Sequence, residues 1–163
     1  MNTALTRSVE ADALQEDLPL HQYLTFRLSR VQAKLNAQGA RVLMDAAGLT
    51  LAQWRVVALV GAAGKTRLSD LARITALDKG LLSRNVKTLA KQGLITSTPD
   101  SFDHRVQHLT LSEQGREIFD RALPVTRRRQ DHLRAGLTPE EIDAFRKVLD
   151  KLEFAAEKTD FME

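Results

Sequence analysis

The sequence contains no cysteine among its 163 residues. This absence excludes a disulfide framework, a zinc site built from thiolates and a redox switch based on a thiol. Long apolar runs are also missing, because the longest mostly apolar stretch, from Val56 to Gly64, is far shorter than a membrane span. The segment from Met1 to Leu20 has scattered acids and no apolar secretory core. We therefore expect a cytoplasmic protein without a membrane segment.

Motifs for catalysis and for metal binding are equally scarce. The sequence has no nucleophile motif, no glycine-rich phosphate loop and no conspicuous pair of carboxylates. Its four histidines, His21, His104, His108 and His132, are far apart, and no two of them form a close ligand pair on a helix. We therefore expect neither an enzyme nor a cofactor or metal site, and we expect exposed imidazoles at His104 and His108.

Charge is distributed unevenly along the chain, although the net charge is only +3. Residues 1–20 carry a net −3 and residues 136–163 a net −4. Residues 21–111 carry +8, since thirteen bases there outnumber five acids. A basic middle section between acidic ends favours contact with a polyanion such as nucleic acid.

Apolar residues recur every three or four positions over much of the chain, which predicts helices. The predicted helices cover residues 20–43, 51–61, 67–74, 78–92, 113–135 and 139–156. The residues that precede helices as N-caps are Thr50, Thr66, Asp78, Ser112 and Thr138. The glycines that stop helices are Gly48, Gly61, Gly64, Gly93 and Gly136. Two short helices joined by a turn at residues 75–77 form a helix-turn-helix.

After Gly93 the apolar pattern changes to that of strands. The segments 94–98 and 106–111 are rich in strand-forming residues, and the connection between them is polar and turn-rich. This predicts a two-stranded β-hairpin that follows the helix-turn-helix as a wing. The fold class is therefore mainly α with a small two-stranded β wing.

The helices at the two ends have apolar stripes without an obvious partner in the same chain. The last helix opens with a capping box of Thr138 and Glu141 and has Pro139 at its first position. Pro124 should kink the preceding helix. The stripe of the last helix consists of Ile142, Phe145, Leu149, Leu152 and Ala156. We expect these helices to pair with a second copy in a homodimer; the alternative is that they fold back onto one monomer.

An ordered set of sequence pieces resembles the MarR family of winged-helix repressors. The pieces are Leu49-Thr50-Leu51-Ala52-Gln53-Trp54-Arg55-Val56, Leu71-Ala72, Leu81-Leu82-Ser83-Arg84, Leu89, Gly93-Leu94-Ile95, Asp103-His104-Arg105 and Leu109-Thr110-Leu111-Ser112-Glu113-Gln114-Gly115. The resemblance implies a homodimer with a winged helix-turn-helix at residues 49–115, a helical dimerisation region at 18–48 and 116–163, and an N-terminal arm at 1–17. One departure is Asn85, which stands where the family usually has an apolar residue; the alternatives are that it tilts helix 78–92 slightly or that it reaches a phosphate.

Burying Leu82, Val86 and Leu89 turns the opposite face of helix 78–92 outward, because successive residues advance by about 100°. Arg84 can then bind guanine through two donors, while Lys79 and Lys87 suit phosphates. In the wing, Asp103 can orient Arg105 toward a narrow minor groove; the alternative is a surface ion pair without a DNA role. The predicted DNA-binding residues are Thr66, Arg67, Ser69, Lys79, Gly80, Ser83, Arg84, Lys87, Asp103 and Arg105.

The resemblance also implies a small, often aromatic, acidic effector that binds where the first, second and fifth helices meet the DNA-binding lobe. Tyr23, Arg27 and Trp54 fall in the corresponding helices. The alternatives are that Trp54 belongs to the core and that Arg27 is a surface or interface charge. The run Arg127-Arg128-Arg129 is either a solvated helix face or a phosphate contact.

These observations predict a dimeric transcription regulator that represses transcription, binds a pseudo-palindromic site in double-stranded DNA and is released by a small ligand. The alternative is a winged-helix module that binds proteins and has no DNA function.

Overall fold

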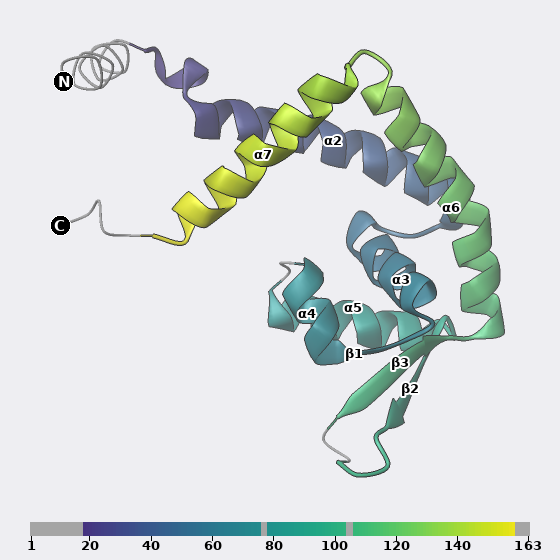
Figure 1. Cartoon of the computed structure of the whole chain (residues 1–163). Coiled ribbons are helices and arrows are strands. Elements are labelled where there is room, and N and C mark those ends of the chain that lie inside the picture. Colours follow the sequence, from purple (N-terminus) through teal and green to yellow (C-terminus); the bar gives the residue numbers. More distant parts are fainter. Residues whose placement is uncertain (1–17, 76–77, 104–105, 159–163) are drawn as a thin grey trace.

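The computed structural model describes residues 18–75, 78–103 and 106–158. The elements are η1 (Leu20–Gln22), α2 (Leu24–Ala47), α3 (Leu51–Ala63), β1 (Lys65–Arg67), α4 (Leu68–Thr75), α5 (Lys79–Lys91), β2 (Ile95–Pro99), β3 (Gln107–Leu111), α6 (Glu113–Arg134) and α7 (Pro139–Ala156). Helices α3 to α5 and the three strands form one lobe, which we call the winged-helix lobe, and α2 and α7 lie above it in Figure 1. Helix α6 connects the lobe to α7.

Most helix ends form where the sequence predicts them, because local side chains satisfy the free backbone groups. The Thr50 hydroxyl accepts the N–H of Gln53, and the Gln53 side chain accepts the N–H of Thr50. Thr138 and Glu141 form the same reciprocal pair. Asp78 and Ser112 cap α5 and α6, and each side chain accepts one backbone N–H of its helix. Gly48, Gly64 and Gly93, which follow helices, have positive φ.

The helix predicted over residues 20–43 is displaced, since α2 spans Leu24–Ala47, and two of the predicted end signals are wrong. Gly61 does not stop a helix, since α3 continues to Ala63. A Cβ at Gly61 would lie 2.6 Å from the ring of Phe119, so this position serves the close approach of α6 to α3. Thr66 is not a cap, because it lies within β1 and α4 begins at Leu68.

The predicted wing is present as β2 and β3, and a third strand joins it. The antiparallel order is β1-β3-β2, with Thr66 opposite Leu109 and Ile95 opposite Leu111. Strand β1 has only three residues, too few for an alternating pattern to be recognised in the sequence. It ties the start of α4 to the wing, so the sheet holds the helix-turn-helix and the hairpin in one unit.

The hydrophobic core lies inside the winged-helix lobe and continues into α2 and α6. Val56, Val57 and Leu89 have no exposed surface, and Trp54 stacks on Phe119 at 6.1 Å between ring centroids. Gly115 lies against the backbone where α6 begins, and a Cβ there would overlap the carbonyl oxygen of Leu94. The lobe is therefore closely packed from α3 through the sheet to α6.

The terminal region is packed far less. Helix α7 has no buried residue, and in α2 the buried residues Gly39, Leu43 and Ala47 all belong to the C-terminal half. Within one chain, the apolar stripe of α7 therefore stays exposed or only half-buried. Within the described part of the chain, no single helix is long and apolar enough for a membrane span. Helices α2 and α3 have sufficient length and apolar content only when they are taken together, and they are bent by 65° relative to one another.

Candidate nucleic-acid interface

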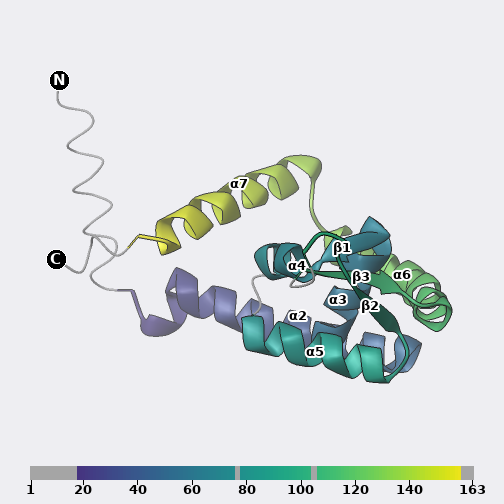
Figure 2. The same cartoon turned by 90° about the horizontal axis from the view of Figure 1, so that it is seen from below.

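Helix α5 is held against the lobe by one apolar face. Leu82 and Leu89 are 1% and 0% exposed and Val86 is buried, so this face packs into the core as the sequence predicts. Seen from below, α5 lies in front of α2, on the lower side of the molecule (Figure 2). The opposite face of α5 is therefore free to meet a large partner.

The outward face of α5 carries the predicted cations. Lys79, Arg84 and Lys87 are exposed, and Ser83 is half-buried. Gly80 lies one turn before Arg84: a Cβ at Gly80 would lie 3.0 Å from Oδ1 of Asp78 and 3.7 Å from the Arg84 guanidinium. The glycine thus leaves room for the capping carboxylate and for Arg84 at the start of the helix.

Asn85 does not reach outward as a phosphate contact. Its side-chain amide donates to the carbonyl oxygen of Leu81 at 2.9 Å, and the residue is half-buried. A polar residue is accommodated here because its own helix satisfies it. The departure at Asn85 therefore leaves the apolar face of α5 intact.

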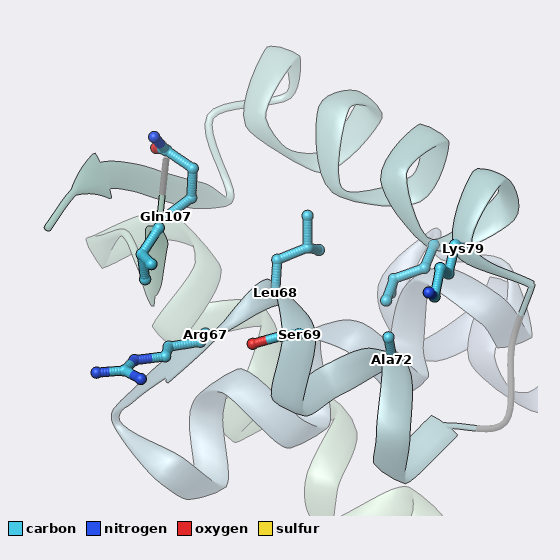
Figure 3. A pocket seen from close by; sticks show the side chains of 8 residues that line it. Arg67, Leu68, Ser69, Ala72, Lys79 and Gln107 are labelled. Carbon is cyan, nitrogen blue, oxygen red and sulfur yellow. The ribbon is translucent and has the colours of Figure 1, made fainter. Parts of the chain in front are cut away.

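A groove of about 380 Å³ separates the start of α5 from the sheet. Figure 3 shows Arg67 and Gln107 on one side and Lys79 on the other, with Leu68 and Ala72 between them. Ser69 also lines the groove, which has an apolar floor completed by Leu82 and Val106. Three of the predicted DNA-binding residues, Arg67, Ser69 and Lys79, thus border one concave surface.

The predicted contacts near the start of α4 do not all have the same setting. Arg67 and Ser69 are exposed, at the end of β1 and in the first turn of α4. Thr66 is half-buried and pairs with Leu109 in the sheet. The structure therefore makes Arg67 and Ser69 accessible, whereas Thr66 contributes mainly to the sheet.

The tip of the wing is organised by Asp100. Its Oδ1 accepts the N–H groups of Phe102 and Asp103 at 2.9 and 3.2 Å. Its Oδ2 lies 2.8 Å from Nε2 of His108 on β3. The hydrogen bond from His108, followed by those from the two backbone groups, holds the pKa of the Asp100 carboxyl well below its usual range. The carboxylate stays ionised and the turn stays closed.

His108 is therefore not the exposed imidazole that the sequence predicts. Its side chain is only 13% exposed and is paired with Asp100. A local pattern cannot reveal this contact, because the two residues meet across the hairpin. Asp103 is exposed at the wing tip, whereas His104 and Arg105 lie outside the described residues.

The residues predicted for effector binding are not brought together. Trp54 is buried and lines a cavity of about 370 Å³ between α2, α3 and α6, together with Arg55, Arg129 and Gln130. Tyr23 and Arg27 are exposed and border a different hollow of about 580 Å³, which includes Phe145 of α7. Arg129 was not predicted for this cavity, and its only sequence signal was its place in a basic run.

Arginines of α6 reach across to neighbouring helices. Arg129 donates to the Leu35 carbonyl oxygen at 2.8 Å and to the Gln38 side chain at 3.0 Å. Arg121 donates to the Ala46 carbonyl oxygen near the C-terminal end of α2 at 3.0 Å. For Arg129, both interpretations of the basic run are wrong, because this side chain joins α6 to α2.

Among the described residues, no group of histidine and acidic side chains is arranged to hold a metal ion.

A model described as the MarR family matches residues 47–106. Over 136 residues the chain is 23% identical to the HTH-type transcriptional repressor IacR of Pseudomonas putida, an alignment that covers 83% of this chain and 78% of that protein. Over 120 residues it is 27% identical to the transcriptional activatory protein BadR of Rhodopseudomonas palustris, covering 72% and 68%.

Solved structures show the same fold. An organohalide-sensing regulator, RdhR-CbdbA1625, determined with bound 2,4-dichlorophenol, matches with a TM-score of 0.73 and 26% identity over 86% of this chain and 83% of that one. A mutant MarR of E. coli in complex with operator DNA matches with a TM-score of 0.66 and 22% identity over 83% and 99%. The arrangement of α5, the sheet and the flanking helices is thus shared with known regulators.

Proposed function

Because the chain belongs to the MarR family of transcriptional regulators, we propose that it binds operator DNA as a homodimer through α5 and the wing. Helix α5 enters the major groove, and the β2–β3 hairpin follows the adjacent minor groove. The regulator acts as a repressor that a small aromatic ligand releases from DNA. Its role is binding and not catalysis, and its place is the cytoplasm.

The observation that carries this proposal is the cationic outer face of α5. Lys79, Arg84 and Lys87 are exposed on a helix whose other face is buried in the core. Arg67 extends the positive charge across the groove toward the sheet. A rigid helix with cations on one side fits the major groove, and its N-terminal residues reach base edges.

The residues divide by their expected role. Arg84 reads a guanine, with Gly80 beside it allowing close backbone approach and Ser83 adding a weaker base contact. Lys79, Lys87, Arg67 and Ser69 bind phosphates. Asp103 and Arg105 are proposed as wing contacts, with Arg105 directed at the minor groove, and Thr66 is proposed to support the interface through its place in β1.

The test begins with genomic fragments selected by the purified protein, which supply a specific DNA. We expect Arg84→Ala to weaken binding to the selected DNA by about 1–3 kcal/mol and to relax its preference over random DNA. Lys87→Ala should weaken binding to both DNAs equally and reduce the salt dependence by about one counterion. Arg146→Ala, an exposed cation on α7, is the matched control.

Three outcomes would contradict the proposal. Equal losses of selected and random DNA in Arg84→Ala would argue against base reading at that residue. A loss as large in Arg146→Ala would show that only overall charge matters. Absence of salt-dependent DNA affinity in the unmodified protein would favour the alternative, a winged-helix module that binds proteins.

The dimer is proposed from the exposed stripes of the terminal region, at residues 18–48 and 116–163. Phe145 on α7 and Leu24 on α2 are 52% and 53% exposed, and a second copy would cover both. A two-fold axis between the copies requires a pseudo-palindromic site whose half-site centres are about one helical turn apart. Footprinting of the selected fragments measures this spacing directly.

The effector is proposed to bind in the cavity between α2, α3 and α6. Trp54 supplies an aromatic wall, while Arg55 and Arg129 supply guanidinium groups for an acid or a phenolate. Tyr23 and Arg27 border the second hollow, which Phe145 places beside the proposed dimer contact. The binding of a chlorinated phenol by one structural relative supports a ligand of this chemical class.

Thermal-shift titration with benzoate and 2,4-dichlorophenol tests the effector. A ligand that binds the folded protein should raise the melting temperature. It should also release the selected DNA, because an effector must favour the state that does not bind DNA. Transcription assays on the same DNA separate a repressor from an activator. Failure of aromatic acids and phenols both to stabilise the protein and to release DNA would contradict the effector proposal.

A further inference from the structure

One large apolar side chain is exposed on the wing, away from the terminal region. Phe102 is 98% exposed, more than any other large apolar residue in the described part of the chain. Most of the others that are half exposed or more lie on η1, α2 and α7, where a second copy would cover them. Phe102 instead lies at the tip of the wing, which projects from the opposite end of the molecule (Figure 1).

Hydrogen bonds hold the turn that carries Phe102. Its N–H donates to Oδ1 of Asp100 at 2.9 Å, and the other oxygen of the same carboxylate pairs with His108 at 2.8 Å. The Asp100 N–H in turn donates to the carbonyl oxygen of Val106 at 2.9 Å, across the hairpin. The ring is thus presented on a braced turn, which reduces the entropy that a partner would have to overcome.

A partner that covers an exposed phenyl ring removes apolar surface from water, which favours binding. The ring does not pack on its own hairpin, because almost all its surface is exposed. Unlike a lysine or arginine, it cannot bind a phosphate. Phe102 lies at the end of a hairpin that β1 joins to the start of α4. This position suits a partner that contacts α5 and continues past it to the wing.

We propose that Phe102 is an apolar contact in the minor groove of the operator. The ring packs against deoxyribose edges and opens one flexible base step, as apolar side chains do in minor-groove proteins. Pyrimidine–purine steps deform most easily, so the residue adds a preference for such a step at the outer end of each half-site. This inference rests on the proposed function, since it requires that the protein bind duplex DNA.

The inference predicts a particular pattern of binding. Phe102→Ala should bind the selected DNA about tenfold more weakly, which is typical when a residue that contributes to binding energy is truncated. The salt dependence of binding should stay unchanged, because the ring neutralises no phosphate. Phe102→Leu should keep most of the affinity, since leucine also acts as an apolar wedge. Ser101→Ala, an exposed neighbour, is the matched control.

The experiment combines fluorescence anisotropy with 2-aminopurine placed at the outer steps of each half-site. We expect the unmodified protein and Phe102→Leu to raise the 2-aminopurine emission, which reports unstacking, and Phe102→Ala to lose this rise. The same affinity and emission in Phe102→Ala as in the unmodified protein would overturn the inference and would leave the effect of Arg84→Ala in place. If the unmodified protein binds no DNA, the proposed function itself is wrong.

Discussion

In the winged-helix lobe Val57, Leu82 and Leu109 are each at most 1% exposed, whereas on α7 Phe145 and Phe154 keep 52% and 62% of their surface exposed. Both regions have the apolar periodicity of amphipathic helices. In the lobe these stripes face one another and the sheet, so each covers the next. On α7 the stripe only borders a hollow beside the start of α2, and no residue of the helix is buried.

The winged-helix lobe forms its core from one chain alone, and the terminal region does not. The lobe buries its apolar surface within one subunit and needs no partner to form a core. The terminal region leaves such surface uncovered, so its stability depends on protomer concentration if a second copy covers it. Substitutions in the two regions should therefore have different signatures, one independent of concentration and one dependent on it.

The largest effect is expected from Gly115→Ala in the lobe. The added methyl group would overlap the carbonyl oxygen of Leu94, which is backbone and cannot move aside without distorting the junction of β2, β3 and α6. We expect the free energy of unfolding to fall by about 3 kcal/mol, the upper part of the range for overpacking. Urea denaturation at two protein concentrations measures this loss and should show it at both.

Gly136→Ala is the control for this substitution. Gly136 has open space around it and no positive φ, so an alanine there should leave stability nearly unchanged. If Gly115→Ala were as stable as Gly136→Ala, the close contact between α6 and the lobe would not be rigid. The lobe would then not be the closely packed region of the molecule.

The next effect is expected from Phe145→Asp on α7. Replacing an exposed aromatic residue by a charge costs the monomer little, but it removes apolar area from the proposed dimer contact and places a charge there. We expect the dimer dissociation constant to rise by about 100-fold, as for a central interface residue. Sedimentation equilibrium measures it.

Arg146→Glu changes charge at the next residue of α7 without removing apolar surface. We expect it to dimerise almost normally, while the lobe of both variants keeps its helical circular dichroism. A Phe145→Asp protein that dimerises as tightly as the unmodified chain would show that α7 is not the contact. The exposed stripe would then need another explanation.

Helix ends and the wing are predictable from sequence because their signals are local. The capping residues Thr50, Asp78 and Thr138 act within three positions of themselves, and all three cap as predicted. The inner face of α5 follows from helical periodicity alone. These features need no knowledge of what packs against them.

The features that sequence analysis missed depend on contacts between distant residues. Strand β1 exists because β3 pairs with it, not because of any pattern in its three residues. The sequence predicts a helix stop at Gly61, whereas the absence of a side chain there admits Phe119 of α6. His108 and Asp100 pair across the hairpin. Trp54 and Tyr23 border separate hollows, although the sequence predicts that both line one pocket.

The smallest effect is expected at the boundary between the two regions, from Arg129→Met. Its guanidinium joins α6 to α2 through Leu35 and Gln38, and methionine keeps much of the length while removing both bonds. We expect a loss of about 1–2 kcal/mol in the free energy of unfolding, since each such bond contributes about 1 kcal/mol. Arg128→Met, in an exposed position beside it, should cost almost nothing. A double-mutant cycle with Gln38→Ala isolates the bond to that side chain, and additive losses would mean that Arg129 does not couple the two helices.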